Sequence, residues 1–359
     1  MKKTNFIYLI VLLVFGVVLA CQKDPGFDSN YPYILDYGGL TPPAIPADNP
    51  LRVEGVKLGR MLFYEPKLSG NNSMSCASCH NQKTAFSDTN RFSLGIKGHF
   101  GGRQAMAVFN MAWNTNEFFW DGRAASLREQ SLKPIQDPVE MDETLTNVVE
   151  KLKSDSRYLV QFRKAFGSDE ITELKISLAL EQFMHSIVSH QSKYDAYLAG
   201  KATLTAEEER GRYLFFTEYN PGFPATSGAD CQHCHSGPNF TDNRYHNNGL
   251  DSTNAIQDVG REKVTNNPMD KGKFRTTSLR NIALTPPYMH DGRFRTLEEV
   301  VEHYNLVHAS STLDPTFYQQ LPKGLELTAS DKAALVAFLQ TLTDQNLISD
   351  PRYSNPFLP

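Results

Sequence analysis

Apolar residues recur at helical spacing over 171–188, where they include Leu174, Leu178, Phe183 and Ile187. This spacing places them on one face of a helix, so the run predicts a long amphipathic helix. Alternation of apolar and polar positions, the signal of half-buried strands, is scarce along the chain. The pattern therefore predicts a mainly α fold with long loops.

Two further helices are indicated by their start signals. Thr205 with Glu208 forms a capping-box pattern, which satisfies free backbone amides at a helix start, and an amphipathic segment follows it. Thr328 with Asp331 is a similar start for the apolar run 333–339.

The N-terminus has a basic start, an apolar run over 6–19 and small residues before Cys21. These features form a secretory signal, and the run is too short and too weakly flanked for a permanent membrane span. It resembles a bacterial lipoprotein signal, which predicts a signal peptide over 1–20, lipidation of Cys21 and a lipid-anchored protein exported to the periplasm. Plain export with cleavage nearby is the alternative. The stretch that follows, to about Pro50, is rich in Pro, Gly, Tyr and Asp and predicts a tether.

The rest of the chain contains an internal repeat. Gly-Arg-Met-Leu-Phe-Tyr at 59–64 is matched by Gly-Arg-Tyr-Leu-Phe-Phe at 211–216, and Trp-Asp-Gly-Arg at 120–123 by His-Asp-Gly-Arg at 290–293. Such a repeat indicates two structural units of common origin. The predicted divisions are a tether over 21–50, an N-terminal domain over 51–200, a C-terminal domain over 201–345 and a tail over 346–359.

The composition agrees with two folded domains. The chain has 359 residues, of which 40% are hydrophobic, enough for about two domains of ordinary size. Its net charge of -4 gives no general attraction to nucleic acid, so a DNA or RNA partner is not expected.

Four of the 5 cysteines lie in two Cys-x-x-Cys-His motifs, at 76–80 and 231–235. This motif is the covalent attachment signal of c-type haem, because two thiols one helical turn apart can form thioethers and the next histidine can ligate iron. Zinc sites, redox dithiols and two disulfides are alternatives, but zinc bound through both cysteine pairs would not need a histidine at the same place in each motif. We therefore predict two covalently bound haem c groups. The predicted attachment and ligand residues are Cys76, Cys79, His80, Cys231, Cys234 and His235.

The repeat also indicates what faces each iron. When Trp120 is aligned with His290, Pro134 falls opposite Tyr304. A tyrosine phenolate can ligate ferric iron, whereas proline has no ligating atom. If this position faces the iron, the first haem is open and can bind peroxide, and the second is closed and suited to electron transfer. The neighbouring His303 is a rival ligand.

Two polar side chains lie near Pro134 in the sequence. Glu140 could take a proton from one oxygen of hydrogen peroxide and return it to the other, which is general acid–base catalysis, and Gln130 could assist. A solvated loop carboxylate is the alternative interpretation of Glu140.

Through these residues the chain resembles the bacterial di-haem cytochrome c peroxidases, from about Leu51 to Thr343. The matching segments are 76–80, 119–124, Gln130, Pro134, 139–141, 231–235, 278–281 and 287–292.

The resemblance implies a role for each candidate residue. The N-terminal domain would carry the peroxidatic haem on His80, and the C-terminal domain the electron-transfer haem on His235. Glu140 and Gln130 would act in peroxide cleavage, and Trp120 would conduct electrons between the haems.

The resemblance also implies a calcium ion between the domains. Its ligands would be the side-chain oxygen of Gln104 and the backbone carbonyls of Thr285 and Pro287. Members of the family are often dimers, so a homodimer is among the expectations, although the sequence identifies no dimer surface.

Three positions depart from the classical members. The classical members have a methionine at the position of Tyr304. A tyrosine there resembles the MauG type, which are di-haem enzymes that mature methylamine dehydrogenase by oxidising protein tryptophans at long range. The classical members also have a removable histidine ligand on the peroxidatic iron, and at that position this chain has Ile96. His99 lies three residues later in a Gly-rich loop. It is either a ligand that moves in from this loop or an exposed histidine. Gln104 replaces the usual asparagine.

The predicted function is that of a peroxidase, which reduces hydrogen peroxide to water with electrons from a small donor protein such as a cytochrome c. One alternative is a MauG-like oxidase that modifies side chains of a partner protein. The other is a non-catalytic di-haem electron carrier, which would need strong ligands on both irons.

Overall fold

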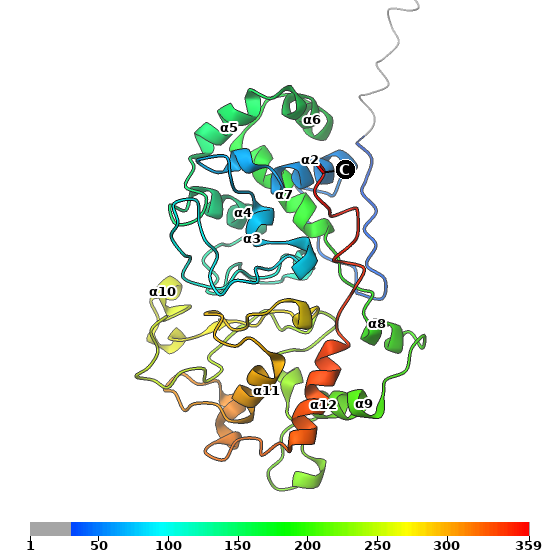
Figure 1. Ribbon diagram of the computed structural model, residues 1–359, viewed down its shortest axis with the longest axis vertical. Coiled ribbons are helices and arrows are strands. Elements are labelled where there is room, and N and C mark those ends of the chain that lie inside the picture. The colour runs from blue at the N-terminus through cyan, green and yellow to red at the C-terminus, as the bar shows by residue number, and fades with distance from the viewer. Residues whose placement is uncertain (1–29, 359) are drawn as a thin grey trace, which may run out of the picture.

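The computed structural model describes residues 30–358, which form two lobes stacked along the long axis of the molecule (Figure 1). Helices dominate both lobes, which confirms the predicted mainly α fold. The predicted signal peptide over 1–20 and Cys21 lie outside the described residues. Within residues 30–358, every helix falls short of the length and apolar character that a bilayer span requires.

The helices and strands are short and joined by long loops. The α-helices are α2 (Val53–Phe63), α3 (Cys76–Cys79), α4 (Leu127–Gln136), α5 (Leu145–Lys153), α6 (Ser156–Phe166), α7 (Glu173–Ser186), α8 (Lys193–Leu198), α9 (Ala206–Phe216), α10 (Glu262–Thr265), α11 (Leu297–Asn305) and α12 (Ala329–Gln340). The 3-10 helices are η1 (Pro66–Leu68), η2 (Gln82–Thr84), η3 (Met111–Trp113), η4 (Pro224–Thr226), η5 (Cys231–His233), η6 (Pro268–Asp270), η7 (Ile282–Leu284) and η8 (Pro315–Gln320). Strands β1 (Tyr245–His246) and β2 (Phe274–Arg275) form one antiparallel pair.

The three predicted helices are present. The apolar run 171–188 forms α7. The side chain of Thr205 accepts a hydrogen bond from the Glu208 amide at the start of α9, and that of Thr328 accepts one from the Asp331 amide at the start of α12. The caps predicted from the sequence therefore set the first turns of these helices.

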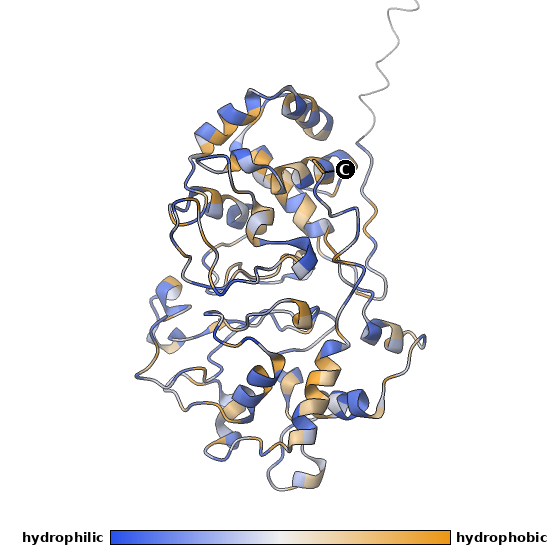
Figure 2. Ribbon diagram, viewed as in Figure 1, coloured by the Kyte–Doolittle hydropathy of each residue, from blue (hydrophilic) through white to orange (hydrophobic). Residues whose placement is uncertain are grey.

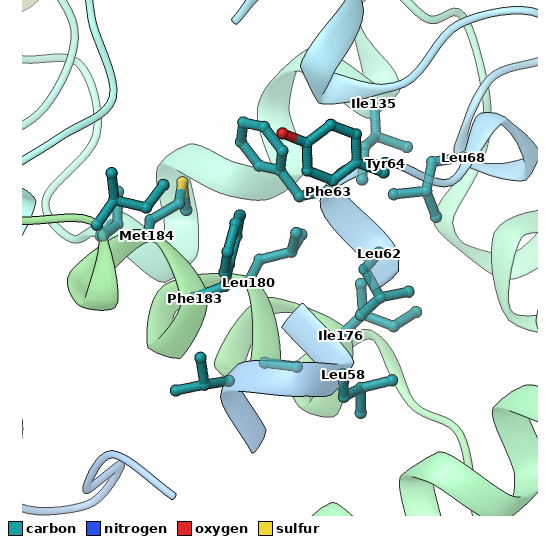
Figure 3. Close-up of a cluster of buried hydrophobic side chains, with 14 of the residues drawn as sticks. Leu58, Leu62, Phe63, Tyr64, Leu68, Ile135, Ile176, Leu180, Phe183 and Met184 are labelled. Carbon is teal, nitrogen blue, oxygen red and sulfur yellow. The ribbon is translucent and has the colours of Figure 1, made fainter. Parts of the chain in front are cut away.

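The core of the first lobe is the contact between α2 and α7 (Figure 3). Leu58, Leu62 and Leu180 are buried there, and full burial of a leucine side chain is worth about 1.5–3 kcal/mol. A Cβ atom on Gly59 would lie 1.9 Å from the backbone oxygen of Ala179. Glycine at this position therefore allows the two helix backbones to approach closely.

The second lobe repeats this contact with α9 and α12. A Cβ atom on Gly211 would lie 1.9 Å from the backbone oxygen of Ala334, and Leu214 and Phe338 are buried beside it. Figure 2 shows hydrophobic residues gathered on α2, α7 and α12, whereas many loops are hydrophilic. The sequence repeat thus corresponds to one helix pair built twice.

The described part of the predicted tether is not free. Asn49 Nδ2 donates to the backbone oxygen of Leu178 on α7 at 3.0 Å. Trp113 Nε1 donates to the backbone oxygen of Thr41 at 2.7 Å. Residues 30–50 therefore pack on the first lobe, because their polar groups find partners there.

The predicted domain limits also need correction. Tyr194 on α8 packs in the second lobe against Phe338, with ring centroids 5.2 Å apart, so this lobe begins before residue 201. The predicted tail over 346–359 returns to the first lobe, where Leu347 and Tyr353 are each 2% exposed. The described chain therefore begins and ends on the first lobe (Figure 1).

Candidate functional site

The first Cys-x-x-Cys-His motif forms the short helix α3 and the residue that follows it. Ser75 and Ser78 cap this helix reciprocally, which fixes its start. His80 Nδ1 donates to the backbone oxygen of Phe86 at 3.1 Å, because a carbonyl can only accept. This hydrogen bond selects the tautomer in which Nε2 carries the free lone pair, so His80 presents Nε2 as a metal ligand.

The second motif is arranged in the same way around η5. His235 Nδ1 donates to the backbone oxygen of Phe240, also at 3.1 Å. Phe86 and Phe240 both have positive φ angles, 60° and 52°, which turn their carbonyl groups toward the histidine rings. Two unrelated stretches would not share this detail, so the motifs are equivalent parts of the repeat.

The four motif cysteines are unpaired thiols in this structure. Burial raises the pKa of Cys76 and of Cys231 to about 12, whereas redox-active dithiols depend on a lowered thiol pKa. Within residues 30–358 no group of three or more His, Cys, Asp and Glu side chains could hold a metal ion. The disulfide, dithiol and zinc alternatives therefore lack structural support, and thioether attachment of haem fits neutral thiols beside a free imidazole.

A cavity of about 1040 Å³, which we call the first cavity, opens beside the first motif. It is lined by Cys79 and His80. Its wall also contains the predicted catalytic residues Gln130, Glu140 and Trp120. Pro134, which has no ligating atom, lies in the same wall.

Local structure explains why these residues share one wall. Gln130 and Pro134 lie four positions apart on α4 and hence on one face of the helix. After the helix ends, the Met141 amide donates to the backbone oxygen of Pro134 at 3.3 Å. This turn folds the chain back and brings Glu140 beside Pro134.

Glu140 is largely enclosed in the first cavity. Burial raises its pKa, the charge of Asp137 raises it further, and Arg123 opposes this effect. A glutamate with a raised pKa can exchange a proton closer to neutral pH than an exposed one. The alternative interpretation as a solvated loop carboxylate therefore disagrees with its position.

The Gly-rich loop beside this cavity is fixed to the Glu140 segment. The Ile96 amide donates to the backbone oxygen of Glu140 at 2.9 Å, and Lys97 forms an ion pair with Asp142 at 2.5 Å. His99 is exposed and does not line the cavity. In this arrangement His99 occupies the position of a surface histidine.

A second cavity, of about 220 Å³, adjoins the second motif. Cys231, Cys234, His235 and Tyr304 line it. Helix α11 supplies Tyr304 as α4 supplies Pro134. At this equivalent position the second cavity therefore has a tyrosine and the first has a proline, as the repeat predicts.

Tyr304 faces the second cavity together with the apolar residues Leu297, Val300 and Val301 of α11, and it is the only one of these four with a ligating atom in its side chain. Burial raises its pKa to about 12, and Asn248 Nδ2 donates to its hydroxyl at 3.0 Å. His303 is buried outside the cavity lining, where its ring packs near Phe294 with centroids 5.6 Å apart. The geometry therefore favours Tyr304 over His303 as the group that would close the second iron.

Trp120 lies between the two cavities and lines both. The indole Nε1 donates to the backbone oxygen of Gln104 at 2.8 Å. The backbone oxygen of Trp120 accepts a hydrogen bond from the Arg275 amide, also at 2.8 Å. The indole is thus held by the first lobe, and the backbone of the same residue is held by the second. This position matches the predicted role of an electron conduit.

Arg275 was not predicted from the sequence, because nothing local distinguishes it from a surface arginine. Its side chain is buried, lines both cavities and donates to the backbone oxygen of Glu117 at 2.7 Å and to Asn243 Oδ1 at 2.5 Å. Within residues 30–358 these partners are neutral oxygens, and burial lowers the pKa of Arg275 to about 10. Glu117 and Asp242 act on this guanidinium only through their charge, and a carboxylate of a haem propionate would give it a direct ionic partner, so the cavity chemistry fits haem.

The three predicted calcium ligands border the same cavity. Gln104, Thr285 and Pro287 all line the second cavity. The amide nitrogen of Gln104 donates to Ser87 Oγ at 2.9 Å, which leaves its amide oxygen as the candidate ligand. The donor set is all oxygen, as calcium prefers, but it contains no carboxylate.

Comparison with known proteins agrees with this geometry. The family model described as di-haem cytochrome c peroxidase matches residues 53–203. The methylamine utilization protein MauG of Methylorubrum extorquens is 37% identical over 301 residues, which cover 83% of this chain and 80% of that protein. The cytochrome c551 peroxidase of Nitrosomonas europaea is 35% identical over 318 residues, which cover 88% of this chain and 86% of that protein.

One solved structure is similar over nearly the whole chain. It is a MauG-like protein associated with microbial copper homeostasis, with a TM-score of 0.81 and 34% identity. The match covers 91% of this chain and 100% of that one.

Proposed function

Because the chain belongs to the di-haem cytochrome c peroxidase family, we propose that it reduces hydrogen peroxide to water with electrons from a small donor protein such as a cytochrome c. One observation carries this proposal. Glu140 and Gln130 share the first cavity with His80, and the residue at the equivalent of Tyr304 is Pro134, which offers no ligating atom. This arrangement supports a ligand site beside a proton-transfer group.

Bound haem would supply the peroxide-binding and electron-transfer chemistry at both sites. The protein residues contribute proton transfer and positioning. Glu140 would accept a proton from the nearer peroxide oxygen and donate it to the farther one, so that this oxygen leaves as water. Gln130 would orient the peroxide by hydrogen bonding. Two electrons and two protons per peroxide give two water molecules.

Electrons would enter through the second lobe. There His235 and Tyr304 would hold the second haem, which would supply electron-transfer chemistry, and a closed iron would not bind peroxide. Trp120, which lines both cavities, would couple the two sites.

Spectroscopy and turnover of the full-length holoprotein test this function. We expect one high-spin and one low-spin ferric haem, and peroxide-dependent oxidation of reduced cytochrome c. Two low-spin haems that remain so on reduction would indicate an electron carrier instead. Failure with every small donor, although peroxide produces a stable oxidised state, would reject the peroxidase.

A MauG-like oxidase is the second candidate, and Tyr304 in the second cavity is the observation that favours it. A phenolate ligand stabilises ferric and higher oxidation states, which suits the withdrawal of electrons from a partner protein. The relative from Methylorubrum extorquens and the copper-associated structure support this candidate. Incubation with peroxide and candidate exported partners, followed by mass spectrometry of their side chains, separates it from the first.

Calcium, export and assembly complete the proposal. Gln104, Thr285 and Pro287 would hold calcium with modest affinity, because affinity rises with the number of charged ligands. The N-terminal pattern supports export to the periplasm with a lipid on Cys21. Resemblance to the family alone supports a homodimer.

A further inference from the structure

The C-terminal strap, residues 345–358, runs from the second lobe to the first (Figure 1). It leaves the second lobe after Asp344, whose carboxylate accepts hydrogen bonds from the backbone amides of His190 and Gln191, both at 3.0 Å. Its far end reaches α2, where Tyr64 Oη donates to the backbone oxygen of Tyr353 at 2.7 Å. Both ends of the strap are therefore fixed.

The middle of the strap is attached to the segment that follows the first motif. Gln82 Nε2 donates to the backbone oxygens of Leu347 and Asp350, at 3.0 and 2.8 Å. The buried ring of Tyr353 meets the ring of Phe86 edge to face, with centroids 6.4 Å apart. The strap thus covers the residues that connect His80 to Phe86.

Phe86 holds the hydrogen bond on which His80 depends. Its backbone oxygen accepts from His80 Nδ1, and both Ala85 and Phe86 have positive φ angles, 51° and 60°. Such angles are costly for a large side chain and persist only where the surroundings impose them. Phe86 is fully buried between Phe63 and Tyr353, so the strap is part of those surroundings.

The equivalent carbonyl in the second lobe is supported differently. Phe240 packs against Tyr194 and Phe215 of its own lobe, with ring centroids 5.8 and 5.9 Å away. The support of His235 therefore comes from within the second lobe, whereas that of His80 comes both from Phe63 of the first lobe and from a segment continuous with α12.

We propose that the C-terminal strap is a positioning element for the proximal ligand of the first haem. It holds the Phe86 carbonyl against His80 Nδ1, and this hydrogen bond sets the orientation of the ring and raises its basicity toward iron. The inference rests on the proposed role of His80 as that ligand. Through the strap, the second lobe takes part in setting the properties of the first iron.

Two variants of the full-length holoprotein test the strap. Tyr353→Leu removes the ring that supports Phe86, and Gln82→Met removes the two hydrogen bonds to the strap. In each, we expect the iron–histidine stretching band of the ferrous first haem to shift to lower frequency and broaden, because His80 becomes a weaker donor. The reduction potential of this haem should rise, while that of the His235 haem stays unchanged.

Two matched controls separate positioning from general loss of stability. Tyr353→Phe keeps the ring and should keep the band. Phe162→Leu alters the same hydrophobic core at α6, and should lower stability without moving the band. If Tyr353→Leu does not fold, Gln82→Met alone tests whether the strap positions His80.

The outcomes distinguish this inference from the proposed function. An unchanged band in the strap variants, or an equal shift in Phe162→Leu, would reject the strap as a positioning element. Absence of the band from the unmodified protein, or of haem on Cys76 and Cys79, would reject the proposed function instead.

Discussion

At the scale of single residues, Pro134 and Tyr304 occupy the same place in two copies of one structural unit. In the proposed function one copy would leave an iron open and the other would close it, while the motif histidine is held by the same kind of backbone hydrogen bond in both copies. Chemical asymmetry between the sites therefore needs very few substitutions. In the same proposal Glu140, which lines the first cavity, would add the proton-transfer group at the open iron.

Replacing Glu140 by Gln removes the proposed proton carrier and keeps the side-chain volume. Peroxide turnover should fall by about 10²–10⁴-fold, the usual contribution of general acid–base catalysis. Steady-state oxidation of reduced cytochrome c measures the effect. Glu129→Gln, at an exposed position of α4 next to Gln130, is the control and should leave turnover unchanged.

The pH dependence of kcat/KM for peroxide should reflect the ionisation of Glu140. A base must be ionised, so kcat/KM for peroxide should fall as pH decreases through the pKa of Glu140, which burial raises above that of an exposed glutamate. The acidic limb of the profile should therefore lie at higher pH than for an exposed carboxylate. Persistence of the same limb in Glu140→Gln would assign it to another group.

Replacing Tyr304 by Phe removes the phenol oxygen and little else. The low-spin ferric signal in electron paramagnetic resonance should change or be lost, because the second iron would lose the ligand proposed for it. His303→Gln is the matched variant on the same helix and should leave the signal unchanged. A changed signal in His303→Gln and an unchanged one in Tyr304→Phe would identify His303 as the ligand.

At the scale of elements, local rules explain the helices well. α7, α9 and α12 were predicted because periodicity and capping act within a few residues of the chain. The equivalence of α2 and α9 followed from the repeat. The site residues on α4 and α11 were found from the same repeat and from resemblance to a family.

The close approach of α2 and α7 makes Gly59 sensitive. Gly59→Ala would place a methyl group 1.9 Å from the backbone oxygen of Ala179, so the helices must separate. We expect a loss of about 1–3 kcal/mol in the free energy of unfolding, measured by denaturant titration. Gly39→Ala, where no atom lies within 4 Å, should have little effect.

At the scale of the whole molecule, sequence patterns were less informative. The limit at residue 200 falls too late, and the packing of the predicted tether and tail on the first lobe was not foreseen, because Tyr194, Asn49 and Tyr353 find their partners far away in the chain. Arg275 and Asn248 were missed for the same reason. Long-range contacts leave no periodic signal in a single sequence.

Electron transfer between the lobes should depend on Trp120. In Trp120→Phe, peroxide should oxidise the second haem more slowly in stopped-flow experiments, while both ferric spectra stay the same. Trp113→Phe provides the control, since that indole donates to Thr41 at the edge of the first lobe. Equal rates in both variants and the unmodified protein would exclude a role for Trp120.

The return of the strap to the first lobe has a consequence for folding. Tyr64 bonds to a residue 289 positions later, so the core of the first lobe is completed only when a distant part of the chain has docked. Contacts of such sequence separation carry a high loop-closure cost. Until the strap docks, the segment after the first motif would stay open to porphyrin attachment, and docking would then cover it.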